Sequence, residues 1–228
     1  GFFSVMAVYM CTRLCVNTTQ LYLPFYLLHT LGLPASAIAQ VPLTVYTFSF
    51  ISSTTVRRVA GAFPSLGQMF TYGVGTGCTA VAAVVLLFLD ASTAPVVFLA
   101  AAALGFGSSQ LMVTSQTLVA ELVGSDTHGA VVFGAMSCVD KVSTGLCIYI
   151  IQNMTLEQGA GGLGELYRHA LVFVPLVSCC LALASLVFAV PRHIKLRRLE
   201  EEADLAQAAG GEDAQPSYFP TITGLNSF

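Results

Sequence analysis

The sequence predicts an all-α integral membrane protein with six transmembrane helices. Of its 228 residues, 55% are hydrophobic and 9% are charged, whereas soluble domains carry about 25% charged residues. Six apolar stretches are each long enough to cross the hydrocarbon core of a bilayer. The low charge content excludes a soluble domain with a large core. Basic residues form no stripe outside the C-terminal segment, so nucleic acid is not an expected partner, whereas the lipid bilayer is.

The six expected spans are separated mostly by short links. A break at 29–34 ends the first span, and a Gly-rich connection at 152–167 precedes the last. In the third span, Gly73 and Gly77 form a GxxxG pattern, which predicts a close helix contact and not a phosphate-binding loop. Small and hydroxyl residues at 105–116 of the fourth span are typical of tight packing beside a cavity. The spans cover about 4–28, 35–56, 64–89, 94–123, 129–151 and 169–190.

The segment after the sixth span, 191–228, is predicted to be a cytosolic tail. It starts with a basic cluster that favours the anionic lipids of the cytosolic leaflet, and an acidic cluster follows. The rest is interrupted by Gly, Pro and polar residues, which predicts disorder. The two clusters are Arg192, Lys195, Arg197 and Arg198, and then Glu200, Glu201, Glu202 and Asp204.

The distribution of basic residues predicts which way the helices point. The links at 57–63 and 124–128 lie on the same side as the tail, and this side collects almost all the basic residues outside the spans. The opposite side has only Arg168, so the positive-inside rule makes the even links and the tail cytosolic. Asn153-Met-Thr then lies on the extracytosolic side, close to the membrane, as a candidate glycosylation site.

Asp140 and Lys141 lie in the middle of the fifth span. From Gly129 to Lys141 the helix rises about 18 Å, against a hydrocarbon core of about 30 Å. A charge at this depth costs roughly 3 kcal/mol, so it needs a partner or a water-lined cavity; a lysine that reaches back to the interface would have too far to go. Adjacent residues point about 100° apart around a helix, so the two side chains are not expected to face one spot. We assign Lys141 to a cavity, where it binds a substrate carboxylate or responds to a coupling proton.

The first span carries a polar stripe formed by Arg13, Asn17 and Gln20. Their i, i+4, i+7 spacing places them on one helical face, which predicts a face toward the bundle interior or a water-filled path. Hydrogen bonding between helices, with no ligand, is the alternative. Asp140 is expected to pair with Arg13 or with a neighbouring helix.

No enzyme or metal-binding motif is present in the sequence. The seven cysteines lie inside apolar segments without CxxC spacing, so they are expected to be small buried residues. There is no HExxH motif and no nucleophile–base pair, and all four histidines lie near span ends or in links. Enzymatic activity and a cofactor are therefore not expected.

Three stretches carry a family resemblance. YMCTRLCVNTTQLYLPFYL and LGLPASAIAQVPLTVYTFSFISS resemble helices seven and eight, and TSQTLVAELVGSDTHGAVVFGAMSCVDKVSTGL resembles the helix ten to eleven region, of the major facilitator superfamily domain-containing protein 12 family. The third stretch is similar, more distantly, to the glycoside–pentoside–hexuronide cation symporters, typified by melibiose carriers. Those carriers have an acidic residue at the end of helix ten and a lysine within helix eleven, matched here by Glu121 and Lys141.

The resemblance implies the C-terminal six-helix half of a major facilitator fold, with the N-terminal half of the same carrier as partner. Such carriers hold their site at mid-membrane between two six-helix halves. The sequence lacks an initiator Met and a signal peptide, which predicts a piece of a longer chain. Glu121, near the cytosolic end, is expected to form a gate with Arg57 or Arg58 rather than to bind solute. The resemblance implies a proton or sodium ion as the coupling ion.

Three functions remain open from the sequence. The first is a secondary active transporter that moves a small polar solute by alternating access, with cysteine entry into lysosome-like organelles as the specific expectation from the family. The second is a sugar:cation symporter of the melibiose-carrier type. The third is a non-transporting half-carrier that acts as a scaffold. A lysosomal or other endomembrane location is expected, with the plasma membrane as the alternative.

Overall fold

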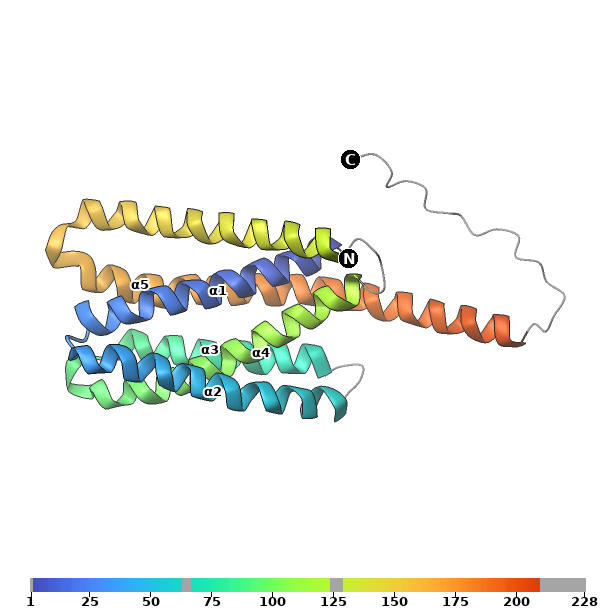
Figure 1. Cartoon of the computed structure of the whole chain (residues 1–228), viewed down its shortest axis with the longest axis horizontal. Coiled ribbons are helices and arrows are strands. Elements are labelled where there is room, and N and C mark those ends of the chain that lie inside the picture. Colours follow the sequence, from blue (N-terminus) through green and yellow to red (C-terminus); the bar gives the residue numbers. More distant parts are fainter. Residues whose placement is uncertain (1, 63–66, 124–128, 210–228) are drawn as a thin grey trace. The chain divides into compact units, whose positions relative to one another are not determined.

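The computed structural model describes residues 2–62, 67–123 and 129–209, except the side chains at 2, 57–62, 91, 92, 94, 156–161 and 188–209. The described residues form helices and no strand, which confirms the all-α prediction (Figure 1). The elements are α1 (Phe2–His29), α2 (Ala35–Ala62), α3 (Gly67–Phe88), the short 3₁₀ helix η1 (Ala91–Val96), α4 (Val97–Val123) and α5 (Gly129–Ala209).

α5 doubles back on itself, as Figure 1 shows. It contains a first limb, Gly129–Thr155, and a second limb, Gly162–Val187, each long and apolar enough to cross a membrane. Residues of both limbs meet in the core, because Ile151 and Leu171 share one hydrophobic cluster and Met136 and Leu186 share another. The Gly-rich connection at 152–167 has a helical backbone, and the chain reverses its direction there.

Within the described residues, α1 crosses the length of the bundle but is not apolar enough to be assigned as a span from composition, unlike α2, α3, α4 and the two limbs of α5. It has 28 residues, enough to cross a bilayer, but Arg13, Asn17 and Gln20 lower its hydropathy. It packs along its whole length in the described core, from Val5 to Leu27. α1 ends at His29, and Gly32, three residues later, has a left-handed φ of 61°, a conformation that glycine adopts without steric cost.

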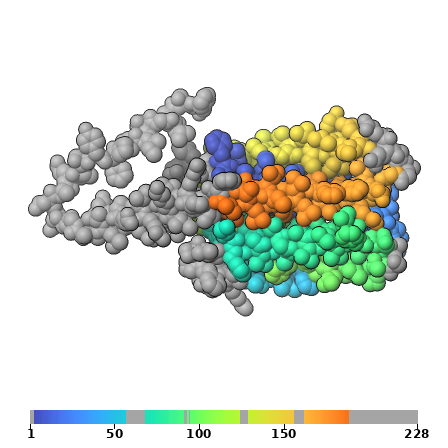
Figure 2. All heavy atoms as spheres, turned by 180° about the vertical axis from the view of Figure 1, so that it is seen from behind, coloured from blue at the N-terminus to red at the C-terminus, as the bar shows by residue number. Residues whose placement is uncertain are grey.

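The two clusters of the core hold α1 to its neighbours by buried hydroxyls as well as by apolar packing. Tyr26 is fully buried and donates to the carbonyl of Leu86 on α3 at 2.7 Å. Thr12 and the Tyr72 hydroxyl, also on α3, lie 2.8 Å apart. Such bonds satisfy the hydrogen-bonding capacity of polar groups that water does not reach inside a bilayer. Figure 2 shows the second limb of α5, in orange, between the first limb and α3 on that face.

α4 makes two close contacts through glycine. A Cβ placed on Gly105 would lie 2.1 Å from the carbonyl oxygen of Val45 on α2. A Cβ on Gly107 would lie 2.7 Å from the carbonyl oxygen of Gly75 on α3. The prediction of tight packing along this part of α4 is confirmed.

The GxxxG prediction for the third span is wrong in its register. A Cβ on Gly73 or Gly77 would have no neighbour within 4 Å, whereas one on Gly75 would lie 2.8 Å from Gln110 Cβ on α4. Gly75 lies about 200° around the helix from Gly73, so the pattern marks the opposite side from the contact.

The described residues after Val190 belong to a second unit. Its backbone is helical as far as Ala209, four residues into the stretch for which the sequence predicts disorder. The charged side chains of the predicted basic and acidic clusters lie outside the described side chains, and residues 210–228 lie outside the described residues.

Candidate transport site between α1 and α5

Asp140 is a buried carboxylate in the middle of a membrane-spanning helix. It is the twelfth of the 27 residues of the first limb and is 3% exposed. Its Oδ1 accepts hydrogen bonds from Asn17 Nδ2 at 3.1 Å and from Thr144 Oγ1 at 3.4 Å. Asp140 and Thr144 are four residues apart, so the helix places them on one face, toward α1.

Asn17 joins α1 to the first limb. Its amide nitrogen donates to Asp140 Oδ1 and also to Thr144 Oγ1, the latter at 3.2 Å. Hydrogen bonds to a charged acceptor are stronger than neutral ones, and a buried acceptor of this kind needs them. Of the two expected partners for Asp140, the structure gives a neighbouring helix and not Arg13, because the donor is Asn17 of α1.

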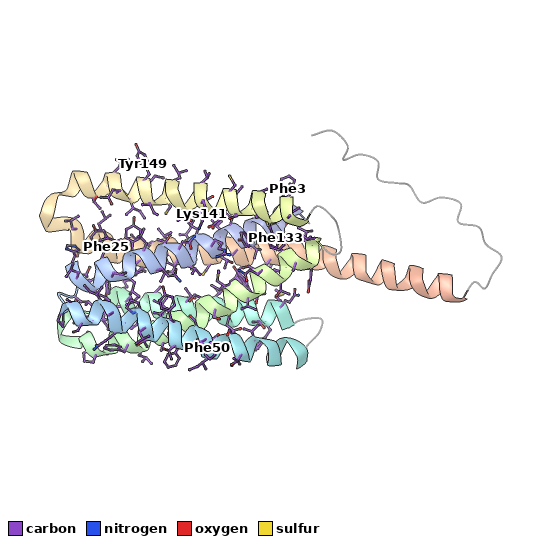
Figure 3. The ribbon with its side chains drawn as sticks, viewed as in Figure 1. Phe3, Phe25, Phe50, Phe133, Lys141 and Tyr149 are labelled. Atoms are coloured by element: carbon purple, nitrogen blue, oxygen red, sulfur yellow. The ribbon has the colours of Figure 1, made fainter. Side chains whose placement is uncertain are left out.

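Lys141 lies beside Asp140 but on the exposed side of the first limb. Its ammonium is 3.5 Å from Asp140 Oδ2, and the two side chains are 73% and 4% exposed. Figure 3 shows Lys141 midway along the limb, between Phe133 and Tyr149. The side chains leave the helix about 100° apart, yet the four-carbon stem of lysine bends back to the carboxylate. The two residues thus face different sides of the limb, as expected from their spacing, although the tip of Lys141 still reaches the edge of the carboxylate.

Arg13 and Gln20 complete the predicted stripe on α1 without joining this network. Arg13 is half-buried; its Nε donates to the Tyr9 hydroxyl at 3.2 Å, and its guanidinium lies 5.2 Å from the centre of the Tyr9 ring. It has no carboxylate partner among the described side chains. Gln20 is exposed. The polar stripe therefore divides into Asn17, which bonds Asp140, and two side chains directed elsewhere.

The gate residue Glu121 is exposed at the end of α4 and accepts a hydrogen bond from Gln68 Nε2 of α3. The side chains of Arg57 and Arg58, its predicted partners, lie outside the described residues. The candidate glycosylation residue Asn153 is exposed, two residues before the end of the first limb.

Three residues of this region were missed by sequence reasoning. Thr144 and Tyr9 lie four residues from Asp140 and Arg13, so helical spacing alone could have indicated them. Gln68 is brought to Glu121 from 53 residues away, and no local pattern indicates it.

A buried thiol pair includes Cys15, two residues before Asn17 on α1. Cys15 Sγ is 3.7 Å from Cys179 Sγ of the second limb, and the two residues are 1% and 2% exposed. We expect iodine, which takes up the two electrons as the thiols lose their protons, to join them as a disulfide. Mass spectrometry of the digested protein should find a linked peptide pair that disappears in Cys179→Ser. Persistence of both free thiols after oxidation would contradict the placement of α1 against the second limb.

Comparison with known proteins finds relatives of this chain. Proteins named major facilitator superfamily domain-containing protein 12 from Equus caballus, Mus musculus and Homo sapiens are 41%, 40% and 36% identical to this chain over 156, 156 and 155 residues. The match covers 68% of this chain. The chain is a relative of these major facilitator superfamily proteins.

The family relationship confirms the predicted resemblance and fits the observed fold to one half of a major facilitator fold, in a multi-pass membrane protein. The match covers 32% of each relative, so the chain spans about a third of their length. No family model matches the chain. No solved structure matches it.

Proposed function

We propose that this protein is a secondary active transporter of the major facilitator superfamily that moves a small polar solute by alternating access. One observation carries the proposal: a carboxylate that is 3% exposed lies at mid-membrane, bonded to α1 and paired with an exposed lysine. A structural membrane helix gains little from such a charge, because burying it is costly. A carrier uses it, since its charge can bind a solute or respond to a coupling ion.

The exposed side of the first limb supports a second, six-helix half as partner. Gly134, Ser137, Lys141 and Gly145 follow one another at intervals of three, four and four residues, and all are exposed. A Cβ on either glycine would meet nothing within 4 Å, so this side is open in the described half. Carriers of this superfamily place their site between two halves. Lys141 then faces the central cavity, with Arg13 and Gln20 of α1 at its border.

Glu121 and Gln68 form part of a gate at the cytosolic end of the bundle. Their hydrogen bond joins α4 to α3, which are packed closely elsewhere at Gly107 and Gly75. Arg57 and Arg58 follow the second span at the same predicted side of the membrane. Ion pairs that form and break at such an end would alternate with solute access.

The solute that best fits this site is a small zwitterion or anion, and cysteine in a lysosome-like organelle is our specific proposal. The ammonium of Lys141 suits a carboxylate, and Asp140 beside it suits an amine. The similarity of Glu121 and Lys141 to melibiose-type carriers favours a sugar moved with a proton or sodium ion as the second candidate.

The test is uptake into vesicles that contain the full-length protein, with labelled cysteine and a sugar panel, with and without a pH gradient. We expect saturable cysteine uptake that falls at least about tenfold in Lys141→Ala, since a lost charged contact of about 1.4 kcal/mol has this effect. Lys195→Ala, which removes the other lysine of the chain, is the matched control and should leave uptake unchanged.

Each other outcome has a defined meaning. Gradient-driven sugar uptake in place of cysteine uptake would assign the protein to the melibiose-type group. Unchanged uptake in Lys141→Ala would remove the lysine from the site. No transport of either solute class would favour a half-carrier scaffold.

A further inference from the structure

Two buried hydroxyls on α1 lack a normal hydrogen-bond partner among the described residues. Tyr22 is 2% exposed, and its hydroxyl has none. Thr18 is fully buried, and its hydroxyl has only the weakly polar Cys147 thiol of the first limb beside it. A polar group buried in a membrane protein without a partner is strongly disfavoured, so each such group calls for a ligand.

Polar residues of three helices lie around the two hydroxyls. Thr18 and Tyr22 are four residues apart, which puts them one turn apart on the same face of α1. The Cys147 thiol of the first limb lies beside the Thr18 hydroxyl, and Tyr167 of the second limb lies against Tyr22. The Tyr22 and Tyr167 rings are 6.0 Å apart. Polar atoms from α1 and from both limbs of α5 therefore converge between these three helices.

These residues lie next to the Asp140 network. Thr18 follows Asn17 directly, and Asn17 donates to Asp140. On the first limb, Thr144 and Cys147 lie one and two turns after Asp140 on the same face. At the other end, the His29 ring, on an exposed residue, is 5.5 Å from the Tyr167 ring. Polar groups thus continue from the buried carboxylate toward the end of α1.

We propose that α1 and the two limbs of α5 enclose a water-binding site lined by Thr18, Tyr22, Cys147 and Tyr167, which links Asp140 to the His29 end of the bundle. Water fits better than an organic solute, because the groups are hydroxyls and a thiol with no buried charge among them, and a water molecule both donates and accepts. Water molecules bound in this site would carry protons to and from Asp140. This last role rests on the proposed transport function, whereas the water site itself does not.

The direct test is radiolytic hydroxyl-radical footprinting of the full-length protein in nanodiscs, which oxidises side chains next to bound water even when they are buried. We expect Tyr22 to be modified several times faster than Tyr26. Tyr26 is the matched control, because it lies one turn along α1, is fully buried, and has its hydroxyl bonded to the Leu86 carbonyl. Equal, slow modification of the two tyrosines would overturn the water site, whether or not the protein transports anything.

A second measurement tests the proton role. Tyr22→Phe keeps the ring and removes the hydroxyl, so we expect pH-gradient-driven uptake to fall several-fold while solute counterflow, which needs no net proton movement, stays unchanged. Tyr26→Phe should change neither the pH-gradient-driven uptake nor the counterflow. Equal loss of driven uptake and counterflow in Tyr22→Phe would overturn the proton role and leave Tyr22 as a packing residue.

Discussion

Gly105→Ala is expected to destabilise the bundle more than any other single methyl addition at the glycines of the described spans. The added Cβ would lie 2.1 Å from the carbonyl oxygen of Val45, and a backbone atom cannot rotate away as a side chain can. α2 and α4 must separate, which also weakens the bond from Ser49 Oγ to the Gly105 carbonyl. Overpacking of this kind costs about 2–3 kcal/mol, equivalent to a fall of roughly 5–10 °C in Tm.

A thiol-reactive dye suits this measurement, because Cys11, Cys15 and Cys179 are buried and react only on unfolding. Gly77→Ala is the matched control, since its Cβ would meet nothing within 4 Å and alanine is the better helix former. A Tm for Gly105→Ala equal to that of Gly77→Ala would contradict the close approach of α2 and α4.

Asp140→Asn is expected to abolish most transport while the protein still folds. Asparagine keeps the volume and an oxygen that accepts from Asn17, but it removes the charge opposite Lys141. Loss of a partner from a buried charge pair costs about 3–5 kcal/mol. Because Lys141 is exposed here, we expect Asp140→Asn to lose only part of this free energy. A loss of about 1.4 kcal/mol already lowers the transport rate about tenfold.

Initial uptake rates, normalised to the amount of folded carrier, give the comparison. Asp90→Asn is the matched control: Asp90 pairs with Arg168 at 3.5 Å, but its side chain is 75% exposed, so solvent screens the pair. We expect less than a twofold change there. Equal uptake by Asp140→Asn and the unmodified protein would show that the mid-membrane carboxylate is structural.

Much of the candidate site could be predicted because helical spacing is a local property. The i, i+4 relation that puts Asn17 on the Arg13 side of α1 is set by the backbone, and so is the depth of Asp140 in its span. What spacing could not decide is which partner each polar group finds. Arg13 lies on Tyr9, and Asn17, not Arg13, reaches Asp140.

The glycines of α3 also show that a local pattern does not decide which residue makes a contact. Gly73 and Gly77 satisfy the GxxxG motif, yet the contact with α4 is made by Gly75. The motif records only that small residues recur at one side of a helix, whereas the contact depends on how α3 is rotated about its own axis. That rotation is set by the sum of packing along Tyr72, Ala82 and Leu86, which no short pattern contains.

The sequence by itself determined the membrane class, the six helices and the depth of the Asp140–Lys141 pair, because hydropathy and helix rise act residue by residue. The tertiary structure alone decided that Lys141 bends back to Asp140, that Gln68 meets Glu121, and that Cys15 meets Cys179. It also placed Tyr22 beside Tyr167, across the reversal of α5. Each of these depends on which helix faces are turned toward each other, and that is a property of the packed bundle as a whole.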